Sequence, residues 1–234
     1  MNAPIDDLPK PAPKPALGAF ITLEGGEGAG KSTQAHRLVE RLQESGIAAI
    51  ATREPGGSPG AEALREILLS GAVKELGPAA EAMLFSAARI DHIDKTIEPA
   101  LAAGSWVICD RFMDSTRAYQ GSLGNVGSGF LQALERVSLG TVFPDLTLML
   151  DLPPEVGLAR AGQRRGVGVE PDRFEGEGLN FHARLRQAFL DIAEQEPGRC
   201  AVIDATAEPD EVSTAIWNVV SARLADWFPS VTRV

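Results

Sequence analysis

The chain has 234 residues, of which 44% are hydrophobic, and its formal net charge is −10. This length and apolar content support one sizeable hydrophobic core, whereas the acidic balance argues against a nonspecific nucleic-acid binder, which would present a basic face. No apolar run approaches the length of a membrane span, and the N-terminus lacks the apolar core of a signal peptide. Composition therefore predicts a cytoplasmic protein with neither a nucleic acid nor a membrane as partner.

Residues 1–17 are rich in proline and poor in large apolar side chains. This composition is typical of a disordered or polyproline-like leader outside the fold. Residues 18–234 are predicted to form a single domain without internal repeats. The domain opens with an apolar stretch, Phe20–Glu24, whose β-branched residues predict a buried strand.

A glycine-rich loop follows this strand. Gly25, Gly30, Lys31 and Ser32 fit the pattern G-x-x-x-x-G-K-[ST] of a phosphate-binding loop. Glycines allow backbone N–H groups to surround a phosphate, and a helix that begins near Lys31 adds its positive N-terminal end. Lys31 is expected to reach the β- and γ-phosphates of ATP, and the hydroxyl of Ser32 is expected to ligate Mg²⁺. The predicted ATP-binding residues are Gly25, Gly26, Glu27, Gly28, Ala29, Gly30, Lys31, Ser32 and Thr33.

Strands and helices alternate along the rest of the domain. Further strands are predicted at residues 47–52, 106–110, 146–151 and 201–204. Helices are predicted at residues 31–45, 61–70, 78–103, 114–140 (in two pieces broken around 121–129), 154–165, 179–195 and 209–227. Apolar strands that alternate with helices indicate a parallel sheet covered on both faces. The predicted fold class is therefore α/β, a P-loop NTPase fold with a five-stranded parallel sheet, helices on both faces and a mobile lid, and its ligands should lie beyond the carboxyl ends of the strands.

The cysteines and histidines do not suggest a metal centre. Cys109 and Cys200 are too few and too far apart in sequence for a disulfide framework or a thiolate metal site. His36, His92 and His182 are scattered along the chain, and each is expected on the surface of a helix. The chemistry therefore has to come from other side chains.

Two aspartates that end predicted strands are candidates for a metal site. Asp110 and Asp151 each follow a run of apolar residues. Carboxylates in this position hold Mg²⁺ directly or through water, and spacing alone leaves both open. Asp151 has a second explanation as the cap of the helix that follows it. We favour Asp110, together with Ser32, because Arg111 follows it and can contact a phosphate beside the metal.

Arginines at strand ends are the candidate anion-binding residues. Arg53 and Arg111 each follow a predicted strand, and a guanidinium group matches phosphate oxygens bidentately. On the long helix, Phe85 and Arg89 are four residues apart and share one face. They are either a core phenylalanine with a rim arginine, or a ring that stacks on a base beside a donor that reads the base edge. Glu27 is either a loop residue without a role or an acceptor for the hydroxyl of a second substrate.

Residues 160–178 predict the lid. Arg160, Arg164 and Arg165 end a helix, and a glycine-bearing loop with Arg173 follows them. A lid would bring a guanidinium group onto the transferring phosphoryl group and exclude water. Phosphoryl transfer needs mainly charge neutralisation and in-line positioning. The candidates are accordingly arginines and a metal-binding aspartate rather than a nucleophilic Ser–His pair.

Six segments together resemble bacterial thymidylate kinase, from about Phe20 to the final helix. These segments are Glu24–Thr33, Thr52–Gly57, Leu84–Arg89, Asp110–Gly121, Pro144–Leu148 and Ile203–Thr206. The second and fourth of them are highly specific in combination, because neither belongs to P-loop proteins in general.

The resemblance implies ATP- and Mg²⁺-dependent phosphorylation of dTMP to dTDP by a homodimer. It implies that Arg53 and Arg111 hold the phosphate of dTMP and that Phe85 stacks on thymine. Tyr119 would crowd the 2′ position of the sugar, and Glu27 would approach its 3′-hydroxyl. The implied dTMP-binding residues are Glu27, Arg53, Phe85, Arg89, Arg111, Ser115, Thr116, Tyr119 and Gln120.

The family has two forms, in which a catalytic arginine lies either in the phosphate loop or in the lid. The loop here holds no arginine, so the chain resembles the lid form. The implied catalytic residues are Lys31, Arg111, Arg164, Arg165 and Arg173, and the last three stay open as the lid arginine. Asp204–Thr206 would border the adenine of ATP. Phe112 departs from the family, because a tyrosine or histidine is common at that position.

Three alternatives remain beside this reading of the sequence. One is another P-loop nucleotide or deoxynucleotide kinase on the same scaffold. A second is a nucleotide-binding switch that phosphorylates no small molecule, and a third is a glycine-rich turn that binds nothing. The candidate acceptor residues favour a kinase, because a switch protein needs no second nucleotide pocket.

Overall fold

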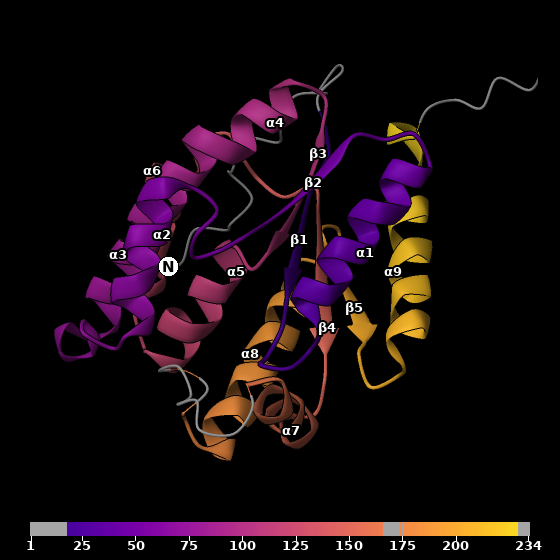
Figure 1. The fold of residues 1–234 in the computed structure, drawn as a ribbon. Coiled ribbons are helices and arrows are strands. Elements are labelled where there is room, and N and C mark those ends of the chain that lie inside the picture. Colours follow the sequence, from indigo (N-terminus) through magenta and orange to yellow (C-terminus); the bar gives the residue numbers. More distant parts are fainter. Residues whose placement is uncertain (1–17, 166–173, 175, 229–234) are drawn as a thin grey trace, which may run out of the picture.

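The computed structural model describes residues 18–165, 174 and 176–228. The strands in this part of the chain form one parallel sheet in the order β2-β3-β1-β4-β5 (Figure 1). The strands are β1 (Phe20–Glu24), β2 (Ala49–Arg53), β3 (Trp106–Asp110), β4 (Leu146–Asp151) and β5 (Cys200–Asp204). The predicted five-stranded parallel sheet is therefore confirmed, with small shifts of the strand ends. The predicted leader lies outside the described residues.

Helices cover both faces of this sheet. The α-helices are α1 (Lys31–Glu44), α2 (Pro59–Leu69), α3 (Gly77–His92), α4 (Glu98–Ala102), α5 (Met113–Thr116), α6 (Ser128–Leu139), α7 (Pro154–Arg165), α8 (Leu179–Gln195) and α9 (Pro209–Arg223). The 3₁₀ and π-helical segments are η2 (Lys74–Leu76), η3 (Ile93–Ile97), η4 (Arg117–Leu123) and η5 (Ala225–Trp227). In Figure 1, α1 and α9 lie together on one side of the sheet, and α2, α3, α4 and α6 lie on the other.

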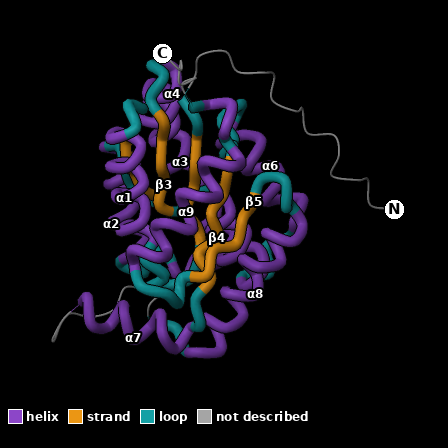
Figure 2. Tube along the Cα trace, turned by 90° about the vertical axis from the view of Figure 1, so that its right-hand side faces the viewer, coloured by secondary structure: helices purple, strands orange, loops and turns teal. Residues whose placement is uncertain are grey.

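The parallel register brings the carboxyl ends of three strands to one edge of the sheet. Leu23 of β1 lies opposite Asp110 of β3, and Asp110 lies opposite Arg53 of β2. The phosphate-binding loop follows β1 directly and therefore begins at this edge. In Figure 2 these carboxyl ends of the strands point downward, and α7 lies beyond them. The site residues predicted at strand ends are thus held together by the sheet itself.

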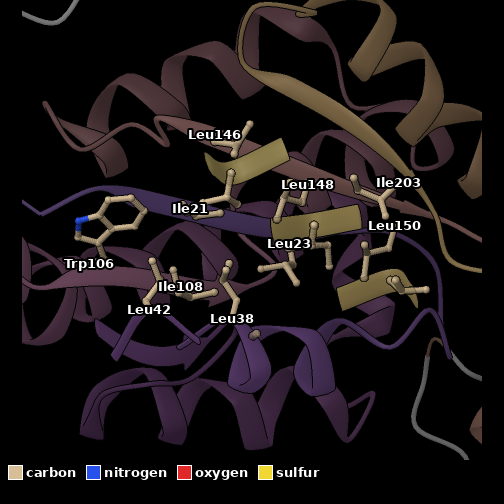
Figure 3. Packing of buried hydrophobic residues seen from close by; sticks show 14 of the residues in the cluster. Ile21, Leu23, Leu38, Leu42, Trp106, Ile108, Leu146, Leu148, Leu150 and Ile203 are labelled. Atoms are coloured by element: carbon tan, nitrogen blue, oxygen red, sulfur yellow. The ribbon is translucent and has the colours of Figure 1, made fainter. Parts of the chain in front are cut away.

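An apolar core fixes α1 against the sheet. Leu38 and Leu42 of α1 pack with Leu23 and Ile203 from the strands (Figure 3), and the three leucines are at most 3% exposed. A fully buried leucine contributes roughly 1.5–3 kcal/mol of transfer free energy. This packing anchors the N-terminus of α1, which starts inside the phosphate-binding loop.

The helix predicted over residues 78–103 is confirmed in extent, from Gly77 to Ala102, but it is not a regular α-helix throughout. The structure divides it into α3, the π-helical η3 and α4. Pro99 in the first turn of α4 has no N–H to donate to the carbonyl four residues back, and its ring crowds that carbonyl. The wide π turn accommodates this interruption. The break predicted within residues 114–140 falls at 124–127, between η4 and α6.

Two of the three histidines contradict their predicted positions on helix surfaces. His36 is exposed as expected, but His92 is 0% and His182 is 4% exposed. His92 has hydrogen-bonding partners on a different element, β2 and the loop that follows it. Helical spacing shows which residues share a face of a helix but not whether a polar partner lies on a neighbouring element, so the sequence pattern missed His92. His182 is buried on α8, and its Nε2 has no hydrogen-bond partner among the described residues.

None of the helices in the described part of the chain is long and apolar enough to cross a membrane. Both cysteines are buried and free. Burial raises the pKa of the Cys109 thiol well above its usual value. Cys109, which is 0% exposed, therefore packs as a small buried hydrophobic side chain.

Candidate active site

The phosphate-binding loop joins β1 to α1. Gly25, Gly28 and Gly30 have positive φ angles of 139°, 68° and 89°, a region that residues with a Cβ rarely adopt. Lys31 is 7% exposed, and its Nζ donates to the carbonyl oxygens of Gly26 at 2.7 Å and Gly25 at 3.1 Å. Burial is the largest of the causes that lower the pKa of Lys31 to about 8. The loop thus sets an ammonium group beside the positive end of α1.

The same loop packs directly against α7. A Cβ on Gly28 would lie 2.0 Å from the carbonyl oxygen of Gly157, and a Cβ on Gly157 would lie 2.3 Å from the carbonyl oxygen of Glu27. Both distances are far below van der Waals contact, so both positions require glycine. Gly157 was not assigned from the sequence, because nothing local to α7 marks it as the neighbour of a distant loop.

Ser32 and Asp110 form the candidate metal site. They lie at the start of α1 and at the end of β3, and Ser32 Oγ donates to Asp110 Oδ2. A hydroxyl and a carboxylate supply the oxygen ligands that Mg²⁺ prefers, so these two residues would hold it. The other candidate, Asp151, accepts two hydrogen bonds of 2.6 and 2.8 Å from Arg186 of α8. Asp110 is therefore the better placed of the two.

Arg111 and Glu27 form a largely buried ion pair, with side chains 16% and 15% exposed. Arg111 Nη2 donates to Glu27 Oε1 at 2.6 Å, and the Tyr119 hydroxyl donates to the same oxygen at 2.9 Å. Burial alone would raise the pKa of Glu27, but the charges of Arg111 and then Lys31 lower it to about 2. Burial, the largest single effect, likewise opposes the charge of Arg111, but the charges of Glu27, Asp110 and Glu24 together raise the pKa of Arg111. Both groups are therefore ionised at neutral pH.

Glu24, which was not singled out in the sequence, fixes the backbone around Arg111. Arg111 has a positive φ of 69°, which is uncommon for a residue with a Cβ. Glu24 Oε1 accepts from the N–H groups of Phe112 at 2.7 Å and Ser115 at 3.2 Å, and Oε2 accepts from the Ser115 hydroxyl at 2.6 Å. Arg111 Nη1 donates to the same hydroxyl at 3.2 Å. Burial, followed by the charge of Asp114, raises the pKa of Glu24 to about 7.

Phe85 and Arg89 project from α3 into one cavity. The ring centre of Phe85 is 6.4 Å from that of Phe174, which lies 5.0 Å from that of Tyr119. Arg89 is 2% exposed and donates through Nη2 to Thr116 Oγ1 at 3.2 Å. This end of the cavity therefore combines aromatic surface with a buried guanidinium group.

Arg53 lies at the exposed edge of the same cavity. Its Nη2 donates to both carboxylate oxygens of Glu62, at 2.9 and 3.1 Å, and the two side chains are 53% and 42% exposed. Arg65, which follows Glu62 by three residues on α2, also lines the cavity and donates to the carbonyl oxygen of Pro55 at 2.6 Å. Arg65 was not singled out in the sequence, because nothing local to its helix marks it as a residue that faces the cavity.

A cavity of about 210 Å³ is lined by most of the predicted residues, but Gly25, Gly26 and Ala29 of the loop are not on its walls. From the loop and α1 it is lined by Glu27, Gly28, Gly30, Lys31, Ser32 and Thr33. The other predicted residues on its walls are Arg53, Phe85, Arg89, Asp110, Arg111, Ser115, Thr116, Tyr119 and Gln120. The lining residues without a predicted role are Glu54, Pro55, Arg65, Leu69, Phe112 and Phe174. Every residue predicted to bind dTMP therefore faces the space beside the phosphate loop.

The side chains of Arg164 and Arg165, at the end of α7, lie outside the described part of the chain, as does Arg173. Their predicted catalytic role stays a prediction. Arg160, one turn earlier, donates to the carbonyl oxygens of Ala205 at 3.0 Å and Thr206 at 3.3 Å. It thereby joins α7 to the loop that the resemblance assigns to adenine.

A phosphate loop, a hydroxyl–carboxylate pair suited to Mg²⁺ and an adjoining cavity with guanidinium and aromatic groups define a P-loop nucleotide kinase. The thymidylate kinase family model matches residues 23–216. The chain is 56% identical over 217 residues to a thymidylate kinase of Bradyrhizobium diazoefficiens, a match that covers 93% of this chain and 95% of that protein. A structure of thymidylate kinase from Ehrlichia chaffeensis has a TM-score of 0.69 and 32% identity, and the match covers 87% of this chain and 98% of that one. The chain therefore belongs to the thymidylate kinase family.

A further relative supports the same assignment. The thymidylate kinase of Rhodopseudomonas palustris (strain TIE-1) is 58% identical over 218 residues, covering 93% of this chain and 94% of that protein. The resemblance found in the sequence motifs is confirmed by these matches over most of the chain.

Proposed function

We propose that this protein transfers the γ-phosphoryl group of ATP to dTMP, giving dTDP and ADP. The proposal is carried by one cavity that extends from the phosphate loop to Phe85, with Arg53 and Arg111 along it. A donor nucleotide needs the loop, and an acceptor nucleotide needs guanidinium groups for its phosphate and a ring for its base. A nucleotide-binding switch would have no use for the second half of this cavity.

On the donor side, the loop and α1 bind the phosphates of ATP. Ser32 and Asp110 would hold Mg²⁺, which neutralises charge on the β- and γ-phosphates when it is bound. Lys31 already lies inside the loop and needs only to exchange backbone carbonyl partners for phosphate oxygens. The adenine would lie next to the loop that holds Asp204 and Thr206. In this loop the backbone N–H and the hydroxyl of Thr206 donate hydrogen bonds of 2.9 and 2.7 Å to Asp204 Oδ1.

On the acceptor side, Arg111 faces the phosphate of dTMP, with Arg53 as a second anion-binding group. Glu27 and Ser115 each hold one terminal nitrogen of Arg111, so the guanidinium is oriented before the substrate arrives. Preorganised donors of this kind stabilise charge in the transition state without a reorganisation cost. Tyr119, bonded to Glu27, would lie beside the sugar.

We propose that one of Arg164, Arg165 and Arg173 supplies the remaining positive charge at the γ-phosphoryl group. The support is the sequence of the loop, Glu27–Gly30, which has no arginine of its own. The close contact between Gly28 and Gly157 adds to this support, because it places the first turn of α7 directly beside the phosphate-binding loop.

We also propose a homodimer, assembled through α3 and α6. Met83 and Ile90 are seven residues apart on α3, and they are 50% and 38% exposed. Phe130 and Val137 are seven residues apart on α6, and they are 39% and 74% exposed. Residues seven apart share a helix face, and α3 and α6 are in contact. An exposed apolar stripe across neighbouring helices is typical of a protein interface.

The proposed site of action is the cytoplasm. The two buried free thiols fit a reducing compartment.

Sedimentation equilibrium tests the proposed dimer. It should give twice the chain mass of 24.8 kDa, and a mass of one chain at micromolar concentration would overturn the proposal.

The function is tested by following ADP release in a coupled assay with ATP, Mg²⁺ and one monophosphate at a time. Turnover is expected with dTMP and not with dCMP or AMP. A preference for another monophosphate would reassign the acceptor, and no turnover with any of them would favour a binding module. Lys31→Ala is the control, because removal of the loop ammonium should abolish most of the turnover.

A further inference from the structure

A series of hydrogen-bonded polar side chains, of which Glu54, Arg89 and His92 are buried, lies beside the end of the cavity proposed for the base. Thr52 Oγ1 is 2.7 Å from His92 Nε2, and His92 Nδ1 is 3.2 Å from Glu54 Oε1. The other carboxylate oxygen, Glu54 Oε2, accepts a bond of 2.8 Å from Arg89 Nε. The side chains of Glu54, Arg89 and His92 are 5%, 2% and 0% exposed. Water therefore competes little for the hydrogen bonds among these three side chains.

The two nitrogens of His92 have different roles in this series. An ionised carboxylate can only accept, so Nδ1 carries the hydrogen and donates it to Glu54. In the neutral imidazole with its hydrogen on Nδ1, Nε2 accepts from the Thr52 hydroxyl. A deeply buried ion pair is favourable only when its remaining lone pairs are also satisfied. His92 satisfies the Glu54 oxygen that the Arg89 Nε–H does not reach.

The end of β2 and the loop that follows it pack against His92. Side chains alternate along an extended chain, so Thr52 and Glu54 point toward His92 while Arg53 between them pairs with α2. A Cβ on Gly57, which has a φ of +84°, would lie 2.4 Å from His92 Nε2. Glycine at this position therefore makes room for the imidazole.

We propose that His92 is a positioning residue for the nucleobase: it fixes the carboxylate of Glu54, which in turn orients the guanidinium of Arg89. Arg89 lines the cavity, and its Nη1 makes no hydrogen bond to any described residue, which leaves Nη1 as a donor for the base. The proposal rests on the proposed role of Arg89 as a contact to the base edge. A guanidinium has only donors, so it suits the O4 acceptor of thymine and opposes the amino group that cytosine carries there.

Two substitutions of His92 separate its two nitrogens. The side-chain amide nitrogen of asparagine lies about where Nδ1 does, whereas that of glutamine lies about where Nε2 does. His92→Asn can therefore keep the donor to Glu54, and His92→Gln loses it. We expect His92→Gln to raise the KM for dTMP about tenfold, because this factor corresponds to the loss of one hydrogen bond to a charged group. The preference for dTMP over dCMP should fall in the same variant. The KM for ATP should change less than about twofold in both variants, and the KM for dTMP should change less than about threefold in His92→Asn.

Thr96→Val is the matched control. Thr96 Oγ1 donates to the carbonyl oxygen of Gly57 at 2.7 Å and so steadies the same loop without touching Glu54. A change in thermal midpoint with no change in the KM for dTMP is expected for this variant. If neither His92 variant folds, Thr52→Val and Thr52→Ser give a second pair, of which Thr52→Val alone should raise the KM for dTMP.

The wild-type protein in the same assay separates the two claims. No turnover of dTMP by the wild type would refute both the proposed function and this role of His92. Wild-type turnover combined with equal KM values for dTMP in His92→Asn and His92→Gln would refute the positioning role alone. A loss shared equally between dTMP and ATP would also refute it, because it would mark His92 as a purely structural residue.

Discussion

The ion pair between Arg111 and Glu27 allows stability and catalysis to be separated. Arg111→Met removes the guanidinium but keeps most of the apolar length of the side chain. Glu27, whose side chain is only 15% exposed, is then left without the charge that pairs with its carboxylate. The pKa of Glu27 is lowered from 4.5 to about 2 against the opposing effect of burial. A lowering of this size corresponds to about 3 kcal/mol in favour of the ionised carboxylate. Removal of one partner of a buried pair costs about 3–5 kcal/mol, so Arg111→Met should lose about 3 kcal/mol of unfolding free energy.

The double variant Glu27→Gln/Arg111→Met removes both charges. It should regain more than half of that loss, because no buried carboxylate is left without its partner. Its turnover of dTMP should nevertheless stay at least about a hundredfold below the wild type, because the guanidinium proposed for the acceptor phosphate is absent.

Urea denaturation followed by circular dichroism measures the stabilities at neutral pH, and the coupled assay measures turnover. The matched single variant is Glu27→Gln, which completes the double-mutant cycle. A double variant no more stable than Arg111→Met would refute the assignment of a stabilising charge pair. Near-normal dTMP turnover in either Arg111 variant would refute its role at the phosphate.

Three further predictions concern the loop and the cavity edge. Because the pKa of Lys31 is lowered to about 8, the free protein loses this positive charge above that pH. The kcat/KM for ATP should therefore fall on the alkaline side of about pH 8. Lys31→Arg should remove that fall from the pH profile. Gly28→Ala places a Cβ 2.0 Å from the carbonyl oxygen of Gly157 and should lower turnover at least about tenfold, whereas Gly162→Ala, with no neighbour within 4 Å of the added Cβ, should retain it. Arg53→Ala should raise the KM for dTMP about tenfold with the KM for ATP unchanged, while urea denaturation should show a stability change within about 0.5 kcal/mol, because its pair with Glu62 is exposed. A stability loss several times larger, or a KM change for ATP instead of dTMP, would contradict the placement of Arg53.

The sequence predicted the parts of the site that local pattern determines. The phosphate loop, the strand that precedes it and the aspartate at the end of β3 are each defined by a few adjacent residues, and parallel strands must bring their carboxyl ends together. Phe85 and Arg89 shared a face by helical spacing, and both line the cavity.

Residues whose role depends on contacts distant in sequence were missed. Glu24 ends a buried strand, and only the fold shows that its carboxylate accepts bonds from Phe112 and Ser115, about ninety residues away. His92 was expected on a helix surface because its partners, Thr52 and Glu54, belong to another element. Tertiary hydrogen bonding of this kind overrides the surface preference of a polar residue.

The binding of dTMP in the cavity is tested most directly by a crystal structure of the protein soaked with dTMP. We predict density for the pyrimidine beside Phe85, with its edge toward Arg89, and density for the phosphate against Arg53 and Arg111. Saturating dTMP that left the space between Phe85 and Arg111 empty, or that bound elsewhere on the protein, would contradict this assignment.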